Sequence, residues 1–444
     1  MKKILKQSNL IFVVCLVITL FSGCTGEKQK LEEDISKDAV NYAASIALDM
    51  SSETVKQEVT VKTFVDGDTT HFNVSSDFND TGVLKARYLA VNTPESTGKI
   101  EEYGKAASEF TKEKLSAATS IIIESDDSNW NMDSTSERYL VWVWYKTEES
   151  EDYKNLNIEL LQNGLAIANS SANNRYGETC MAAIAQAKQQ KLNIYSGEKD
   201  PNFYYGEAIE LTLKELRTNI ADYNGLKVAF DGIITKNSNH SVYVEAYDAE
   251  TDKYYGISVY YGYGLSGEGL EILTVGNETR IVGTVQYYET GGTYQVAGLT
   301  YRQMKPDDPG NIQKLSDGHT PAYVLTEADT FVNGKVIIEE EEGSKEFSYA
   351  ELAMSTSIEM KNLKVINIYT TSDEASSSYG AMTLHCEANG IPVTVRTEVL
   401  FDENKELVTE EAYKNKTIDV KGIVDYFNGE YQIKVFSVND IVIQ

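Results

Sequence analysis

The sequence predicts a mainly β protein, in which a small β-barrel with packed helices precedes two repeated β-rich domains. Tyrosine is frequent, at 29 of 444 residues, and proline is rare, at 6, a composition that favours sheets over disorder. Short strands with alternating apolar residues are separated by glycine turns. A motif from the middle of the chain also recurs near its C-terminus, which indicates an internal repeat.

The N-terminus has the features of a bacterial export signal. Three early lysines precede an apolar run over 10–21, which is shorter than a comfortable membrane span. The four residues Phe-Ser-Gly-Cys that end at Cys24 resemble a lipobox, in which small residues precede a cysteine that is lipidated and becomes the mature N-terminus. We therefore expect a lipoprotein signal peptide over 1–23 and stable lipid anchoring at the extracellular face of a bacterial membrane. An ordinary cleaved signal peptide is the alternative.

A polar spacer is predicted over 24–57 and the first ordered domain over 58–200. The domain's elements are expected in the order strand, turn, two strands, helix, two strands and two helices. They fall at 58–65, 66–68, 69–74, 83–91, 104–115, 121–124, 139–145, 156–163 and 181–192. Gly164 follows the second helix, where glycine commonly ends helices. This order predicts a small barrel covered by helices.

The net charge of −28 at pH 7 excludes a general nucleic-acid coat, which would need a basic surface. Any contact with nucleic acid must therefore be a local site that a cation assists. Solubility at a cell surface is the simpler meaning of the acidity.

Three segments of the first domain contain residues suited to phosphodiester hydrolysis. This chemistry needs cations that neutralise phosphate, a base that orients water, and donors for the charge that grows in the transition state. The turn at 66–69 offers two carboxylates, and the segment 87–95 runs from an arginine into a proline-fixed loop that ends in a glutamate. Arg138 opens an apolar strand. Each segment alone has a simpler meaning, because Asp-Gly turns join many hairpins.

In this order and spacing, the segments resemble the staphylococcal nuclease (thermonuclease) family. The family pattern is a D-G-D-T turn, an R-x-x-x-V-D-T-P-E strand and loop, a Y-G-x-x-A helix, and an arginine before the next strand. The matching residues of this chain lie at 66–69, 87–95, 103–107, 138, 163–166 and 185–195. The resemblance implies a five-stranded OB-like barrel with three helices and a nuclease activity.

The resemblance also implies a calcium site. Asp68 matches a direct ligand, Thr93 a ligand through its backbone carbonyl, and Asp66 a carboxylate that acts through water. Asn92 replaces the family's second calcium-binding aspartate. Its amide oxygen can still coordinate calcium, but one negative charge is gone, so we expect weaker binding. Extracellular calcium modules work at roughly 10⁻⁴–10⁻³ M, a range that tolerates such a loss.

The catalytic roles carry over by position in the same way. Glu95 matches the residue that positions or deprotonates the attacking water, and Arg87 and Arg138 match two phosphate-binding arginines. The implied reaction is calcium-assisted in-line attack on phosphorus with loss of the 5′ oxygen and 3′-phosphate products. Glu137 is expected to compete with phosphate for Arg138. The segment 167–171 lacks the two tyrosines that stack on a base in the family's prototype, so the resemblance implies no base preference.

The rest of the chain contains a tandem repeat. The segment 281–288 recurs at 420–427, and each copy continues through a glycine turn into Tyr-Gln-Val or Tyr-Gln-Ile. We expect domains over 206–305 and 345–444 and, because it holds half of the prolines, a linker over 306–344.

The repeat resembles OB-fold domains, which bind single strands through aromatic side chains. The candidate nucleic-acid-binding residues are Tyr287, Tyr288, Tyr426 and Phe427. Alternatively, these aromatic residues are core or cross-strand pairs of the barrels, a common use of such residues. The sequence indicates no particular protein partner for these domains.

Together, these features predict a surface-anchored, calcium-dependent nuclease, a hydrolase of phosphodiester bonds in extracellular DNA or RNA. The alternative is a nucleic-acid- or protein-binding surface module whose nuclease fold has lost catalysis.

Overall fold

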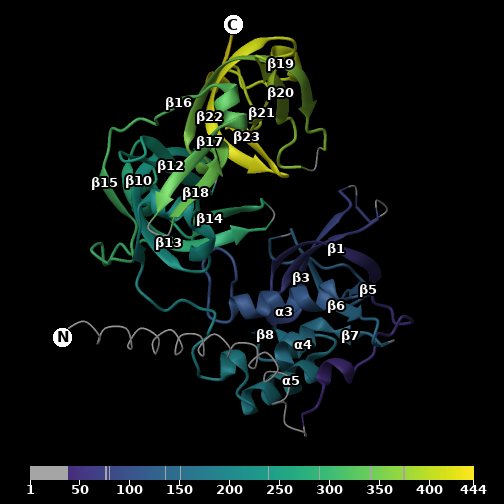
Figure 1. The fold of residues 1–444 in the computed structure, drawn as a ribbon. Coiled ribbons are helices and arrows are strands. Elements are labelled where there is room, and N and C mark those ends of the chain that lie inside the picture. The colour runs from purple at the N-terminus through teal and green to yellow at the C-terminus, as the bar shows by residue number, and fades with distance from the viewer. Residues whose placement is uncertain are drawn as a thin grey trace, which may run out of the picture.

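The computed structural model describes residues 39–444, except for 76–77, 80, 136, 151, 239, 290, 341–342 and 374–375. The predicted signal peptide and Cys24 lie outside the described residues. Within the described part, no helix is both long and apolar enough to cross a membrane. The same part contains seven α-helices and three closed five-stranded barrels, which confirms the predicted OB-like fold class (Figure 1).

The first barrel contains the predicted strands in the predicted order. They are β1 (Lys56–Asp66), β2 (Thr69–Asn73), β3 (Val83–Tyr88), β5 (Ser120–Glu124) and β6 (Tyr139–Lys146). The ring closes in the order β1–β2–β3–β6–β5–β1, with a parallel pair between β3 and β6. Phe72, Leu84 and Ala86 alternate with more exposed neighbours and are buried in the core. The period of two that predicted the strands is therefore the period of their inward-facing side chains.

Three helices pack on the first barrel: α3 (Gly104–Ser116), α4 (Leu156–Gln162) and α5 (Gly177–Gln189). Asn155 caps α4, because its side chain accepts a hydrogen bond from the backbone N–H of Ile158. The apolar stripe of α5 is buried through Cys180, Ala183, Ile184 and Ala187.

The second and third barrels repeat the same ring. Their strands are β10 (Lys227–Ser238), β11 (Ser241–Asp248), β12 (Lys253–Tyr260), β13 (Glu278–Tyr288) and β14 (Thr293–Ala297), then β19 (Ser357–Thr370), β20 (Met382–Ala388), β21 (Ile391–Thr397), β22 (Thr417–Phe427) and β23 (Glu430–Val435). In all three barrels the third and fifth strands form the parallel pair. The sequence repeat corresponds to the β13–β14 and β22–β23 hairpins.

The segment 306–344, predicted as a linker, contains regular structure. β15 (Gln313–Ser316) pairs with β13 and β16 (Val324–Leu325) pairs with β19, so the segment adds one strand to each neighbouring barrel. α8 (Ala328–Asn333) follows, and β17 (Lys335–Glu340) forms a hairpin with β18 (Gly343–Ser348). Proline content alone did not reveal these pairings.

The other elements of the described chain are short. They are β4 (Ala90–Asn92), β7 (Lys154–Asn155), β8 (Ile167–Asn169), β9 (Ile209–Glu210), β24 (Ile441–Ile443), α6 (Leu213–Thr218), α7 (Glu268–Ile272), α9 (Tyr349–Leu352), η1 (Tyr42–Ala44), η2 (Ser171–Asn173), η3 (Asn193–Tyr195), η4 (Ile220–Tyr223), η5 (Glu410–Ala412) and η6 (Val438–Asp440).

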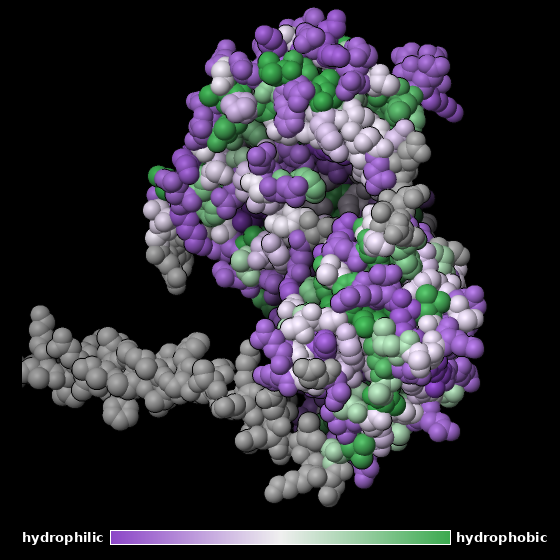
Figure 2. Space-filling model, turned by 90° about the vertical axis from the view of Figure 1, so that its right-hand side faces the viewer, coloured by the Kyte–Doolittle hydropathy of each residue, from purple (hydrophilic) through white to green (hydrophobic). Residues whose placement is uncertain are grey.

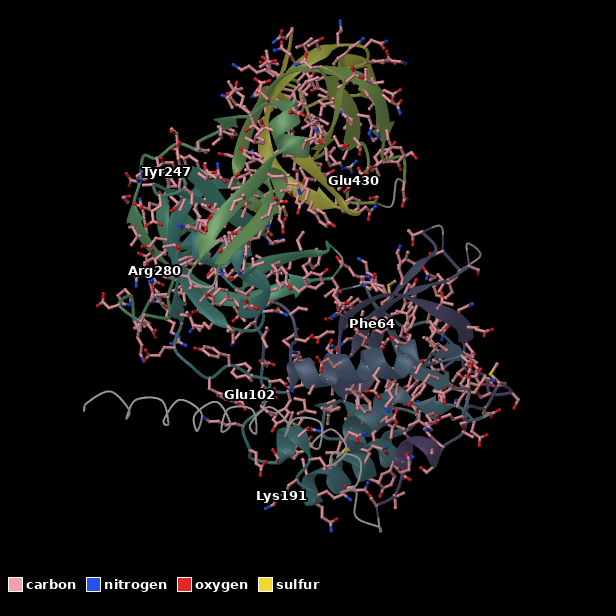
Figure 3. All side chains as sticks on the ribbon, viewed as in Figure 1. Phe64, Glu102, Lys191, Tyr247, Arg280 and Glu430 are labelled. Atoms are coloured by element: carbon pink, nitrogen blue, oxygen red, sulfur yellow. The ribbon has the colours of Figure 1, made fainter. Side chains whose placement is uncertain are left out.

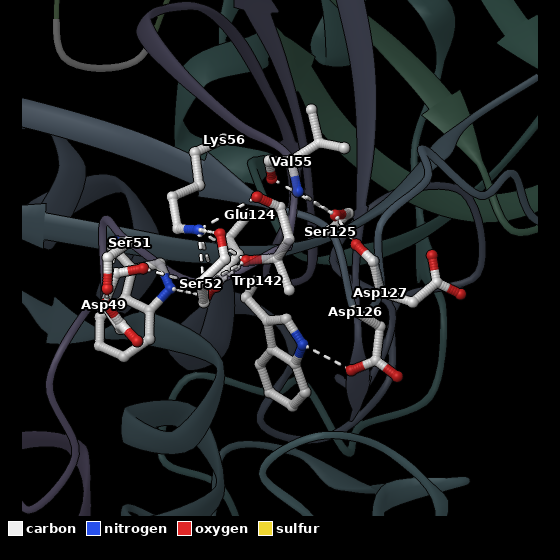
Figure 4. Close-up of polar contacts among 12 residues, drawn as sticks. Asp49, Ser51, Ser52, Val55, Lys56, Glu124, Ser125, Asp126, Asp127 and Trp142 are labelled. Carbon is white, nitrogen blue, oxygen red and sulfur yellow. Dashed lines mark hydrogen bonds and ion pairs between the residues drawn. The ribbon is translucent and has the colours of Figure 1, made fainter.

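The segment just before β1, expected to belong to the spacer, packs on the first barrel. Glu124 of β5 is fully buried and accepts a hydrogen bond from Thr54 Oγ1 at 2.6 Å. Lys56 Nζ lies 3.8 Å from the same carboxylate and 2.7 Å from Ser52 Oγ (Figure 4). Ala43 of η1 also donates its backbone N–H to Gln162 of α4. These bonds place ordered structure before the expected start at residue 58.

A buried carboxylate joins the second and third barrels. Glu245 of β11 accepts hydrogen bonds from the backbone N–H groups of Ala322 and Ser357 at 2.9 and 2.7 Å. The Ser357 hydroxyl donates a third bond at 2.9 Å. Figure 3 labels Phe64 on the first barrel, Tyr247 and Arg280 on the second, and Glu430 on the third. On the face shown in Figure 2, hydrophobic residues are scattered among hydrophilic ones.

Candidate active site

The turn between β1 and β2 is packed tightly against the loop that follows β4. A Cβ atom on Gly67 would lie 2.9 Å from both Oγ1 and Cγ2 of Thr93, and 3.0 Å from Cβ of Ala107. Thr111 of α3 donates its hydroxyl to the Gly67 carbonyl at 2.5 Å. Glycine is therefore required for this approach, and the three sequence motifs meet through the contacts of Gly67, Thr93 and Ala107.

The start of α3 is equally close to the loop. A Cβ atom on Gly104 would lie 2.1 Å from the carbonyl oxygen of Glu95. Tyr103, just before the helix, has a φ of 65° and donates its backbone N–H to Asp200 Oδ2 at 2.7 Å. The helix thus fixes the backbone that carries Glu95, and its first residue must lack a side chain.

Asp68 is fully buried at the end of the turn. Its Oδ2 accepts the backbone N–H of Thr93 at 2.9 Å, and Arg87 of β3 donates Nη1 to its Oδ1. The same guanidinium donates Nη2 to Asn92 Oδ1 at 2.5 Å. Burial raises the pKa of Asp68, and the positive charge of Arg87 opposes this shift. Arg87 is therefore the cation that compensates the buried carboxylate.

Asp66 and Glu95 form an acidic pair beside that ion pair. Asp66 is buried, and its Oδ1 accepts hydrogen bonds from the backbone N–H of Gly67 at 2.8 Å and the hydroxyl of Ser96 at 2.6 Å. Glu95 is exposed as a residue, but partial burial of its carboxyl group, then the charge and hydrogen bonding of Asp66, raise its pKa to about 7. Glu95 therefore exchanges its proton near neutral pH. Ser96 was not predicted as a site residue. The available signal was its hydroxyl group, directly after Glu95 in the sequence.

Arg138 makes its hydrogen bond and ion pair with Asp133. Its Nε donates to Asp133 Oδ2 at 2.7 Å, and although burial opposes the shift, hydrogen bonds from Thr135 and Arg138 lower the pKa of Asp133 to about 2. Glu137, the expected competitor, instead lies 3.9 Å from Lys85 Nζ. The prediction that Glu137 would pair with Arg138 was therefore wrong. Asp133 is the partner because its backbone N–H also donates to the Arg138 carbonyl, which brings the two residues together.

The donor atoms of this site fit calcium by their chemistry. Asp68 contributes a carboxylate, Asn92 an amide oxygen and Thr93 a backbone carbonyl, all of them hard oxygen ligands. Among the residues that the structure describes, no group of three or more His, Cys, Asp or Glu forms a metal-binding cluster. Arg87 contacts the two side-chain oxygens that the family resemblance assigns to calcium. A cation bound there would share these oxygens with Arg87 and be repelled by its positive charge.

Two of the four candidate aromatic residues of the repeats form ring pairs. Tyr287 pairs with Tyr294, and Tyr426 pairs with Tyr431, each across neighbouring strands with ring centroids 5.0 Å apart. Tyr287, Tyr288 and Phe427 are exposed, and Tyr426 is half-buried. The structure thus contains the cross-strand pairs that the alternative predicted.

The fold and site define a class of protein: a nuclease-like barrel with an acidic turn, a buried arginine–carboxylate pair and a glutamate loop, followed by two OB-like barrels. Residues 85–197 match the family model described as staphylococcal nuclease homologue, so the chain contains a domain of that family. The matched range includes Arg87, Asn92, Glu95 and Arg138, and it begins after the turn at 66–69. The domain suggests a nuclease that acts on nucleic acid.

Proposed function

We propose that this protein is a calcium-dependent nuclease that hydrolyses phosphodiester bonds of extracellular DNA or RNA. The observation that carries the proposal is the meeting of Asp68, Arg87 and Glu95, which come from a turn, a strand and a loop. A phosphodiester hydrolase needs one cationic fork for phosphate and one carboxylate that handles water's proton. This site supplies both beside an oxygen-donor set.

Glu95 is suited to the role of general base. A pKa of about 7 lets its carboxylate accept a proton from water at neutral pH and release it afterwards. Asp66 keeps that pKa high through its negative charge and is itself held by Ser96. Calcium, when bound, would supply positive charge that neutralises the phosphate.

Arg87 is the phosphate-binding residue of the proposed site. One N–H of each Nη atom already donates to Asp68 or Asn92, so the whole fork becomes available to a phosphate only when these two bonds are released. Ligation of the oxygens and release of the guanidinium are therefore coupled. This coupling favours phosphate binding when the site is loaded with a cation.

We also propose that a lipid on Cys24 anchors the protein to the extracellular face of the membrane. The support is the lipobox-like sequence after a short apolar run. The net charge of −28 suits a soluble surface domain, and it makes a local cation necessary at the site of contact with nucleic acid.

Incubation of the soluble ectodomain with plasmid DNA and RNA, in calcium and then in chelator, tests the proposal. We expect cleavage in calcium and none in chelator. Glu95→Gln should lower turnover by roughly 10²–10⁴-fold, the usual contribution of a positioned acid–base group. Glu178→Gln, an exposed change on α5, is the control. Binding without cleavage by the wild-type protein in calcium would instead support the catalytically inactive module.

A further inference from the structure

A cavity of about 550 Å³ lies between the loop after Glu95 and the second barrel. This volume is within the range of ligand pockets, roughly 300–1,000 Å³. Its side-chain lining combines four tyrosines with two basic residues: Lys99, Tyr260, Tyr261, Tyr263, Tyr301 and Arg302. The proposed catalytic residues of the first barrel are not among those that line it.

The cavity wall is continuous with the loop over residues 95–101, called the catalytic loop below because it carries Glu95. Glu101 donates its backbone N–H to the Glu95 carbonyl at 2.8 Å, which closes the loop, and Gly98 and Lys99 lie between these residues. Gly98 exchanges two hydrogen bonds with the Gln286 side chain of β13, at 3.1 and 2.7 Å. The position of the loop is thus tied to the second barrel.

Two further contacts fix the same interface. Lys112 Nζ of α3 lies 2.5 Å from Glu289 Oε1, just after β13. Gly298 has a φ of 74°, and a Cβ atom there would lie 3.1 Å from the Gly98 carbonyl oxygen. The two segments approach closely at Gly298, where a side chain would crowd the Gly98 carbonyl. The cavity therefore has walls from both domains in a defined arrangement.

The aromatic side of the cavity is open to a ligand. Tyr263 is 85% exposed, and its ring centroid lies 4.0 Å from that of His240. His240 is held in turn by a hydrogen bond between Nδ1 and the Gly262 carbonyl at 3.1 Å. Tyr260 and Tyr301 are half-buried in the lining. An exposed tyrosine supported by a second ring offers a flat face on which a base can stack.

The basic residues make the cavity suitable for a phosphate backbone. Lys99 is exposed on the catalytic loop. Arg302 is also exposed, and although its Nη1 donates to Asp308 at 2.6 Å, a guanidinium has further N–H donors. In a chain with a net charge of −28, two cations beside four tyrosines indicate an anionic aromatic ligand rather than a neutral sugar.

We propose that this cavity binds a single-stranded segment of nucleic acid, with bases on the tyrosines and phosphates at Lys99 and Arg302. The inference rests on the proposed nuclease function and extends its substrate path from the first barrel onto the second. The cavity is separate from Tyr287, Tyr288 and Phe427, the exposed candidate residues near the β13–β14 and β22–β23 turns.

The test measures strand binding and catalysis separately. The probe is a fluorescent single strand of about 16 nucleotides, the upper site size of one OB fold. Its binding is measured by anisotropy in chelator. It is also measured in calcium with variants that carry Glu95→Gln, which prevents cleavage of the probe. Turnover of bis(4-nitrophenyl) phosphate in calcium reports the catalytic site with a substrate too small to reach the cavity. The variants are Tyr263→Ala and Lys99→Ala. Their controls are Tyr369→Ala and Lys335→Ala, at exposed residues of β19 and β17.

Loss of one stacked base weakens binding by about 5-fold or more. We expect at least this increase in Kd for Tyr263→Ala and a smaller, salt-dependent increase for Lys99→Ala, with both controls and small-substrate turnover unchanged. Wild-type Kd values in both variants, or no strand binding by the wild-type protein, would overturn the cavity assignment while turnover stands. Strand binding that depends on Tyr263 without any turnover would support the cavity and overturn the nuclease proposal.

Discussion

The guanidinium of Arg87 is hydrogen-bonded to the carboxylate of Asp68, a side chain that is fully buried. The proposed phosphate-binding residue and the proposed metal-binding residue thus neutralise each other. Truncating either one leaves the other as an unpaired charge, so conservative substitutions are the more informative ones here.

We expect Arg87→Lys to lower kcat/KM on DNA by about 10-fold or more, because an ammonium cannot bind two oxygens as a planar fork does. The change also removes the bridge between Asp68 and Asn92. Full activity of this variant would contradict the assignment of Arg87 to phosphate.

Arg138 requires its own comparison, since it is paired with Asp133. Arg138→Ala should lower activity more than Lys154→Ala, a change on β7. If both variants cleave DNA equally well, Arg138 has no contact with substrate.

The raised pKa of Glu95 predicts that the metal-free protein loses stability as pH rises from 4.5, the ordinary value, to about 7. The folded state binds the proton more tightly than the unfolded state, so deprotonation favours unfolding across this window. Glu95→Gln should lack this part of the pH dependence, and Glu178→Gln should retain it. Melting temperatures measured in chelator between pH 4 and 8 test this, and parallel curves for wild type and Glu95→Gln would contradict it.

Asn92→Asp should lower the calcium concentration needed for half-maximal activity, because ligand charge tunes affinity in oxygen sites. The melting temperature should also rise more on addition of calcium than it does for wild type. Asn404→Asp, in an exposed turn of the third barrel, controls for the added charge alone. An unchanged calcium midpoint would show that residue 92 does not contact the metal.

Gly104→Ala should destabilise the first domain by about 1–3 kcal/mol, the usual cost of forcing an added carbon into a packed site. The new Cβ would lie 2.1 Å from the Glu95 carbonyl oxygen, so the loop that carries Glu95 must shift and activity should fall with stability. Ser116→Ala, exposed at the other end of α3, should change neither. Denaturant unfolding and DNA cleavage measure the two effects.

Cys24→Ala should release the protein to the medium or leave it unprocessed in the membrane fraction. Acyl labelling of the wild-type protein provides the positive signal, and an absence of label at Cys24 would contradict lipidation.

The features that the sequence predicted well depend on local patterns. Strand alternation outlined the first barrel, the tandem repeat located the other two, and the ordered motifs placed Asp68, Arg87 and Glu95 in one domain. Local patterns did not reveal Ser96 as a partner of Asp66, because a hydrogen bond across 30 residues has no periodic signal. The edge strand β15 was missed for a similar reason, since it is defined by its pairing with β13 rather than by its composition.

The ring closure shared by the three barrels also affects whether copies of this protein aggregate through their strand edges when they are close together. A closed ring has no long open row of unpaired N–H and C=O groups for a neighbouring molecule to extend. The strands that pair with a ring from outside, such as β7, β15, β16 and β24, are two to four residues long, too short to template a stable intermolecular sheet. The separate β17–β18 hairpin has six residues in each strand, and its lysines and glutamates are the kind of charged residues that blunt a sheet edge. At the high local density that lipid anchoring would create, edge-to-edge aggregation is thereby suppressed by topology.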